Sequence, residues 1–140
     1  MVVLPFILGP IGNNTYLVAD PVTGTAVVID PSFDPEPVLE EAGRRGWKIQ
    51  SIWLTHAHFD HIGGTVALRL ALGDEIPVAM HPLDLPLWRE DGGARIFGFP
   101  FSAGKAPRMM VEHGQKLDLG EEEFEVRHTP GHSPGHVVFY

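Results

Sequence analysis

The feature that most constrains this chain is a dense cluster of metal-competent side chains between Thr55 and His61. The cluster contains three histidines and one aspartate within six residues, at positions His56, His58, Asp60 and His61. Histidine binds first-row metals through a neutral ring nitrogen, and aspartate binds them through a carboxylate oxygen. The alternative, four polar residues in a solvated loop, does not account for this spacing. The cluster therefore predicts a metal site.

The residues before the cluster predict how it is presented. Ser51 to Leu54 form an apolar run that is typical of a β-strand. Side chains alternate along an extended segment, so His56, His58 and Asp60 are expected on one side at the strand's end. His61 breaks this alternation, and it can join the others only where the chain curls.

The residues after the cluster indicate such a curl. Residues 62–65 are typical of a turn, and residues 66–72 of a helix that Gly73 closes. Two pairs of ligands at one strand-to-helix junction suggest two metals. His56 and His58 would hold the first metal, and Asp60 and His61 the second.

A third ligand for the first metal is expected from a distant part of the chain, because a catalytic zinc usually has three protein ligands and one open position. The candidate is His132. It lies in a run rich in proline and glycine, residues 128–136, that follows a strand-like segment, residues 124–127. Such a turn has little backbone freedom and can hold an imidazole rigidly.

These motifs resemble the metallo-β-lactamase superfamily, most closely its glyoxalase II (hydroxyacylglutathione hydrolase)-like branch. The matching stretches are T-H-A-H-F-D-H, T-P-G-H-S-P-G-H and the earlier run from Val27 to Pro31. The first is highly specific for the superfamily, and the resemblance covers essentially the whole chain. It implies an α/β fold, an αββα sandwich with mixed sheets, in which His56, His58 and His132 hold one metal and Asp60 and His61 help to hold a second.

The sequence departs from the family pattern near its end. The resemblance implies an aspartate that bridges the two metals and a later histidine, but no Asp or Glu follows Thr129. The chain stops in an apolar run, His136 to Tyr140, which would leave an unprotected strand edge. We expect either a fragment whose second half is incomplete or a partner chain over this edge, such as a homodimer through the C-terminal strand.

Composition limits the organisation and the partners. With 140 residues, 44% of them hydrophobic, the chain is expected to form a single domain over residues 1–140. The net charge of −8 argues against nucleic acid as a partner, and so against the RNA-processing nucleases that share the first motif. A small-molecule substrate is expected instead.

The absence of cysteine restricts the ligands to nitrogen and oxygen. Zinc, as one or two ions, fits such a set best, and iron or manganese are alternatives where a carboxylate takes part. The first six residues lack a charged leader, and no apolar run approaches a membrane span, so we expect a soluble, cytoplasmic protein without a membrane partner.

The rest of the pattern favours a mixed sheet with helices. Strands are expected over residues 2–8, 15–18, 25–29 and 76–80, and a helix capped by Asp34 is expected before Gly46. Residues 83–88 are typical of a short helix, and the three glutamates at residues 121–123 are typical of a solvated turn. Residues 91–107, rich in glycine, phenylalanine and proline, are typical of an irregular loop that serves as a lid or substrate wall, or as an apolar plug.

Other polar residues are interpreted more plainly. Asp30 is expected to be a structural or helix-entry carboxylate, His81 a structural or surface residue, and His113 an exposed one. His128 is expected to contact the metal ligands and orient them without binding the metal itself, and His136 is expected to brace the turn.

Three functions remain open. The first is a metal-dependent hydrolase with a metal-bound hydroxide oriented by Asp60, acting on a thioester such as an acylglutathione, as the resemblance implies. The second, also by resemblance, is a mononuclear iron persulfide dioxygenase. The third is an inactive fragment, or a half-site that a partner chain completes.

Overall fold

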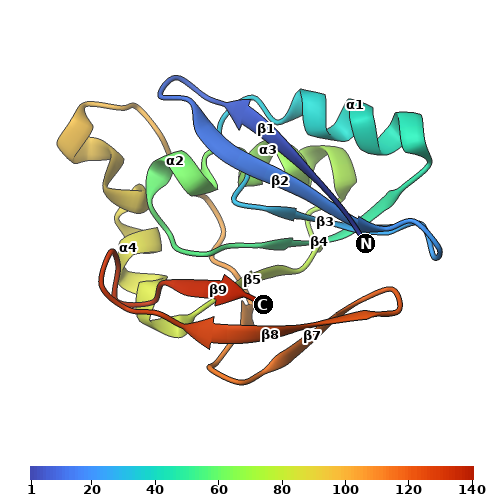
Figure 1. Ribbon diagram of the computed structural model, residues 1–140. Coiled ribbons are helices and arrows are strands. Elements are labelled where there is room, and N and C mark those ends of the chain that lie inside the picture. Colours follow the sequence, from blue (N-terminus) through green and yellow to red (C-terminus); the bar gives the residue numbers. More distant parts are fainter.

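The structure, a computed structural model, describes residues 1–140 and has three layers. Helices cover one face of a large sheet, and a small sheet covers its other face (Figure 1). The large sheet has six strands in chain order: β1 (Val2–Leu8), β2 (Asn13–Asp20), β3 (Thr25–Ile29), β4 (Lys48–Trp53), β5 (Val78–Met80) and β6 (Met109–Met110). The antiparallel small sheet contains β7 (Lys116–Leu119), β8 (Glu122–His128) and β9 (Val137–Phe139).

The connections between strands change along the large sheet. β1, β2 and β3 pair antiparallel, as the turn-punctuated N-terminal sequence predicts, and β3 to β6 pair parallel. Parallel strands need crossover connections, and here these contain the helices. The helical segments are α1 (Glu36–Arg45), α2 (Phe59–Ile62), α3 (Thr65–Leu72), η1 (Pro82–Asp84), α4 (Leu85–Arg89) and η2 (Asp91–Phe97).

Alternation along the large sheet produces two apolar cores. Ile52 and Leu54 face the helices, where Val38 of α1 and Leu68 of α3 are fully buried. Trp53, between them in sequence, faces the small sheet and packs edge-on against Phe124 at 5.3 Å between ring centroids. Burial of each large apolar side chain contributes roughly 1.5–3 kcal/mol to folding. The alternation of side chains along β4 therefore determines which of its faces the helices cover and which the small sheet covers.

Two local expectations were wrong. Asp34 does not cap α1: it adopts a left-handed φ of 58°, the helix begins after Pro35, and no side chain caps its first turn. A residue before proline is disfavoured in the helical region, which places Asp34 outside the helix. Glu122 was expected in a turn, but β8 begins there and pairs with Leu119.

The other elements match the pattern closely. α1 ends at Gly46 with φ 70°, the left-handed conformation that glycine adopts at low cost. None of the helices combines the length and the apolar character that crossing a membrane requires.

Candidate metal centre

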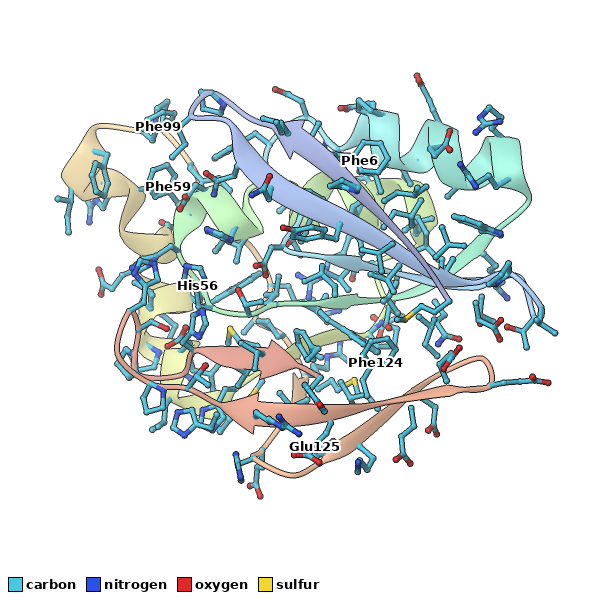
Figure 2. All side chains as sticks on the ribbon, in the orientation of Figure 1. Phe6, His56, Phe59, Phe99, Phe124 and Glu125 are labelled. Atoms are coloured by element: carbon cyan, nitrogen blue, oxygen red, sulfur yellow. The ribbon has the colours of Figure 1, made fainter.

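The side chains of the predicted metal site meet at the edge where the parallel strands of the large sheet end. Asp30 follows β3, Thr55 to His58 follow β4, and η1 follows β5. The carboxyl ends of neighbouring parallel strands lie at one edge of a sheet, so short loops from three strands converge there. His56 marks this edge in Figure 2, where β9 of the small sheet approaches β4. The N–H of Val137 in β9 donates to the Thr55 carbonyl at 2.8 Å and joins the two sheets beside the site.

His56 is held in one orientation by a short chain of hydrogen bonds. The Thr55 hydroxyl donates to Asp30 Oδ2 at 2.5 Å, and Thr55 Oγ1 lies 2.9 Å from His56 Nδ1. Because the hydroxyl proton is directed to Asp30, the threonine oxygen accepts from Nδ1–H. The lone pair is then on Nε2, which is buried and has no hydrogen-bond partner. An orphaned, buried lone pair of this kind is what a metal ligand presents.

His58 and His132 present their ring nitrogens to the same point. His58 Nδ1 and His132 Nε2 lie 3.1 Å apart, and the ligand atoms of His56, His58 and His132 all lie within 4.8 Å of one another. Nitrogens about 2.0–2.1 Å from a tetrahedral zinc lie roughly 3.3–3.4 Å apart. The structure thus brings His132 beside the first motif, and the three residues fit a single first-row cation.

Asp60 and His61 reach the site by a route that strand alternation does not describe. The chain leaves the extended conformation at Phe59, where α2 begins, so Asp60 and His61 are neighbours on a helical turn. The curl expected at His61 is present, but it starts earlier and includes Asp60. His61 Nε2 lies 3.6 Å from Asp60 Oδ2, and His61 Nδ1 lies 3.1 Å from Asp30 Oδ2. Asn13 of β2 donates to Asp60 Oδ2 at 2.6 Å.

Asp30 was interpreted as a structural carboxylate, and the structure places it in the centre itself. It accepts from the Thr55 N–H at 2.7 Å and contacts His61, and Asp30, His56 and His61 form a second group that could hold a metal. Its position after β3, parallel to β4, was the signal that could have identified it.

Electrostatics keep two of the histidines neutral. Burial is the largest cause that lowers the pKa of His56, and together with the charges of His61, His58, His132 and His136 it brings this pKa to about 2. Burial, and then His132, also lower the pKa of His58. Burial opposes the charge on His61, but the hydrogen bond to Asp30 and the charges of Asp30 and Asp60 outweigh it and raise its pKa. His56 and His58 therefore present lone pairs near neutral pH.

The lowered pKa of His56 predicts a pH dependence of stability in the metal-free protein. Below about pH 6.5 the unfolded chain takes up a proton on His56 and the folded chain does not. The free energy of unfolding therefore decreases as the pH is lowered from about 6.5 towards 2. His61, whose pKa is raised, opposes this trend. Chemical unfolding in chelator from about pH 7.5 to about pH 5 should show a shallower slope for His56→Gln than for the wild type. Equal slopes in the two proteins would contradict the prediction.

A residue outside both motifs, Asp84, connects the two loops that carry them. Asp84 is fully buried and accepts hydrogen bonds from the Ala57 N–H at 2.9 Å, the Ser133 hydroxyl at 2.8 Å and the Gly135 N–H at 2.6 Å. Ala57 lies between His56 and His58, and Ser133 follows His132. One carboxylate therefore connects both ligand loops.

The remaining histidines support the loops. His136 Nδ1 bonds Thr129 Oγ1 at 2.8 Å and braces the turn, as expected. His128 stacks on His81 with ring centroids 4.2 Å apart and bonds the Pro134 carbonyl, so it acts on the loop that carries His132. His113 is exposed, and its Nδ1 accepts the His128 N–H.

The sequence places this site within a known family. Residues 8–140 match the family model described as Metallo-beta-lactamase superfamily. The chain belongs to the metallo-beta-lactamase superfamily. The family fold agrees with the expected α/β class, and a crystal structure described as BLEG-1 B3 metallo-beta-lactamase superposes with a TM-score of 0.88 at 34% identity, covering 99% of this chain and 66% of that one.

Other metallo-beta-lactamase relatives extend the comparison. A hydroxyacylglutathione hydrolase of Rhodospirillum rubrum is 37% identical over 131 residues, which are 91% of this chain and 43% of that enzyme. The crystal structure of TTHA1623 in a di-iron-bound form has a TM-score of 0.83 and 43% identity, covering 98% of this chain and 66% of that one. The chain thus spans less than half the length of the hydroxyacylglutathione hydrolase that it matches and about two thirds of the two solved structures.

A cavity of about 360 Å³ adjoins the ligand histidines on the side of α2. It is lined by Ile11, His58, Phe59, Asp60, Phe97, Phe99 and His132. Phe59 comes from α2, and the other two phenylalanines, Phe97 and Phe99, come from the loop expected over residues 91–107, which begins with η2. This loop supplies both a wall and a plug: Phe97 and Phe99 line the cavity, whereas Phe101 packs against the core between the large sheet and the helices.

Proposed function

We propose that this metallo-beta-lactamase family member is a metal-dependent hydrolase of thioesters, with its cation held by His56, His58 and His132. The observation that carries the proposal is the convergence of three imidazoles, one of which has a buried ring nitrogen with no hydrogen-bond partner. The match to hydroxyacylglutathione hydrolases over 91% of the chain supports a thioester such as an acylglutathione. Because the chain spans only part of those enzymes, the activity of the whole protein is part of the proposal.

Asp60 and His61 are proposed to take part in a second cation site next to the first. His61 belongs with Asp30 and His56 to the second candidate group, in which Asp30 Oδ2 lies 3.1 Å from His61 Nδ1, and Asp60 lies beside this group with its Oδ2 3.6 Å from His61 Nε2. An all-nitrogen set favours zinc at the first site, whereas carboxylate oxygens at the second also suit iron or manganese. The di-iron form of TTHA1623, at 43% identity, makes iron the main alternative to zinc.

The protein's own groups prepare the site for hydrolysis. When bound, a cation supplies Lewis acidity and lowers the pKa of a water molecule from about 15.7 to about 7. Three neutral histidines leave the full positive charge of that cation uncompensated, and the lowered pKa values of His56 and His58 favour this state. The Asp30–Thr55–His56 chain fixes the tautomer that points Nε2 into the site.

Asp60 is proposed to position the attacking water. Asn13 donates to its Oδ2, which fixes the carboxylate and leaves Oδ1 to accept a hydrogen from water. Hydrolysis adds the water oxygen to the thioester carbonyl carbon and breaks the C–S bond. One water proton passes by way of Asp60 to the departing thiolate, and the product is a carboxylic acid, which ionises at neutral pH.

The direct test combines metal analysis with an assay on a thioester of glutathione. We expect the purified protein to contain one or two zinc, iron or manganese ions per chain, and to release free thiol from a hydroxyacyl thioester of glutathione in a reaction that chelator removes and the metal restores. A folded protein that binds none of these metals would overturn the proposal, as would a metal-loaded protein without thioesterase activity.

A further inference from the structure

We propose that the site selects thioesters whose acyl group is apolar, of the size of a hexanoyl or phenylacetyl group, and that Phe97, Phe99 and Ile11 bind that group. The inference rests on the proposed thioesterase function and adds to it the class of substrate. It differs from the polar hydroxyacyl group in the name of the relatives that the chain matches.

The cavity beside the ligand histidines has two chemically different ends. His58, His132 and Asp60 form the polar end, where the reacting carbonyl must lie if the proposed function holds. The other lining residues are Ile11, Phe59, Phe97 and Phe99. The lining thus contains no lysine or arginine and no side-chain amide or hydroxyl. Ligand pockets span roughly 300–1,000 Å³, so a cavity of about 360 Å³ lies near the lower end of that range and is sufficient for one compact group.

The apolar wall is built by aromatic packing on the metal-binding motif itself. Phe59, between His58 and Asp60 in sequence, lies 5.3 Å from Phe97 and 5.2 Å from Phe99 between ring centroids. Figure 2 shows Phe99 directly above Phe59, at the upper left near the turn that joins β1 to β2. The positions of the Phe97 and Phe99 rings are therefore coupled, through Phe59, to His58 and Asp60 in the metal site.

The segment that carries Phe97 and Phe99 is anchored at both ends. Gly92 adopts φ +64° and lies so close to the motif that a Cβ there would be 2.3 Å from the Phe59 nitrogen. Asp91 Oδ1 accepts the Ala103 N–H at 2.9 Å, and the Trp88 indole N–H donates to the Gly104 carbonyl at 3.2 Å. These contacts favour a preformed wall over a lid.

Two of the apolar wall residues remain in contact with solvent. Phe97 is 67% exposed and Ile11 is 56% exposed, although both line the cavity. An apolar acyl group would remove this surface from water, which favours binding in proportion to the area covered. A hydroxyl or carboxylate on the acyl group would lose its hydration here without gaining a donor from the wall.

The test uses the metal-loaded full chain and two series of thioesters. In the first series the thiol is constant and the acyl group is acetyl, lactoyl, butanoyl, hexanoyl or phenylacetyl. We expect kcat/KM to rise about two- to fourfold for each methylene group that the wall covers, and the lactoyl ester to be a poorer substrate than the butanoyl ester. In the second series the acyl group is constant and the apolar length of the thiol varies. We expect kcat/KM to change less with the length of the thiol than with the length of the acyl group.

Substitutions identify the wall. Phe97→Ala should lower kcat/KM for the hexanoyl and phenylacetyl esters about five- to tenfold and change the acetyl ester less than about twofold. Ile96→Ala is the matched control, because Ile96 is the adjacent residue, is 86% exposed and does not line the cavity. Its acyl profile should equal that of the wild type.

A binding measurement separates this inference from the proposed function. Calorimetric titration with phenylacetate and with lactate should show tighter binding of phenylacetate, and Phe97→Ala should remove the difference. Thioester hydrolysis with no acyl preference, or a Phe97→Ala effect equal for all acyl groups, would overturn the inference and leave the proposed function intact. If no thioester is cleaved, the proposed function fails. Phenylacetate binding that depends on Phe97 would then still support the apolar site, and its absence would overturn that site too.

Discussion

His132→Ala is expected to lower kcat/KM for thioester hydrolysis by about a thousandfold or more and to weaken metal binding, while the protein remains folded. The substitution leaves His56 and His58 as the only histidines of the first group, too few for a catalytic zinc site. A thousandfold loss corresponds to about 4 kcal/mol, in the range of the several kcal/mol that a bound cation contributes to stabilising transition-state charge. His132 is exposed, so its removal leaves no buried cavity.

The measurements are metal content after gel filtration, kcat/KM and the melting temperature of the metal-free protein. His113→Ala is the matched control, because His113 is also exposed and lies outside both groups of candidate ligands. It should keep its metal and nearly all of its activity. Should His132→Ala keep full metal content and wild-type kcat/KM, the assignment of the first site would be wrong.

Much of the site was predictable because its ligands are close in sequence and adjoin a clear strand. The apolar run before His56 ends β4, and the turn before Thr65 precedes α3, so the cluster had to lie at a strand-to-helix junction. His132 was found by a different signal, the proline- and glycine-rich turn after a strand. The structure explains why the turn reaches the site: β9 returns along β8, and the N–H of Val137 bonds Thr55.

The groups that hold the ligands could not be found in the same way, because each acts across a large sequence separation. From its sequence neighbours Asn13 looks like a turn residue, yet it is the first residue of β2 and its amide donates to Asp60, 47 positions later. Asp84 looks like an acidic residue at the start of a short helix, and it does lie at the N-cap of α4. Its side chain, however, makes no capping bond and turns to loops that lie 27 and 49 or more positions away.

The position of Asp60 shows where local periodicity fails. Alternation along an extended chain predicted one face for His56, His58 and Asp60, but β4 ends at Trp53 and α2 begins at Phe59. The period changes from two to that of a helix within the motif. Tertiary contacts decide this change: Gly92 of η2 lies against the Phe59 backbone and Asp84 accepts the Ala57 N–H, and neither is visible from residues 55–61 alone.

Asp84→Ala is expected to lower the free energy of unfolding of the metal-free protein by about 3–5 kcal/mol. The carboxylate has no exposed surface and accepts bonds from the N–H groups of Ala57 and Gly135 and from the Ser133 hydroxyl. Each buried donor left without a partner costs about 1–3 kcal/mol, and folded domains of this size have a total stability of only about 5–15 kcal/mol. Unfolding by urea in the presence of chelator would measure the loss.

The variant that tests positioning, separately from stability, is Asp84→Asn. Asparagine fills the same space but places an N–H₂ group against the Gly135 N–H or the Ala57 N–H, so one of the two loops must move. Because those loops carry His56, His58 and His132, we expect metal affinity, measured by chelator competition, to fall about 10- to 100-fold. Ser133→Ala removes one of the three bonds and should have a smaller effect on affinity, and Asp118→Asn, an exposed carboxylate on β7, should have none. An Asp84→Asn protein that is less stable but binds metal like the wild type would show that Asp84 supports the fold without positioning the ligands.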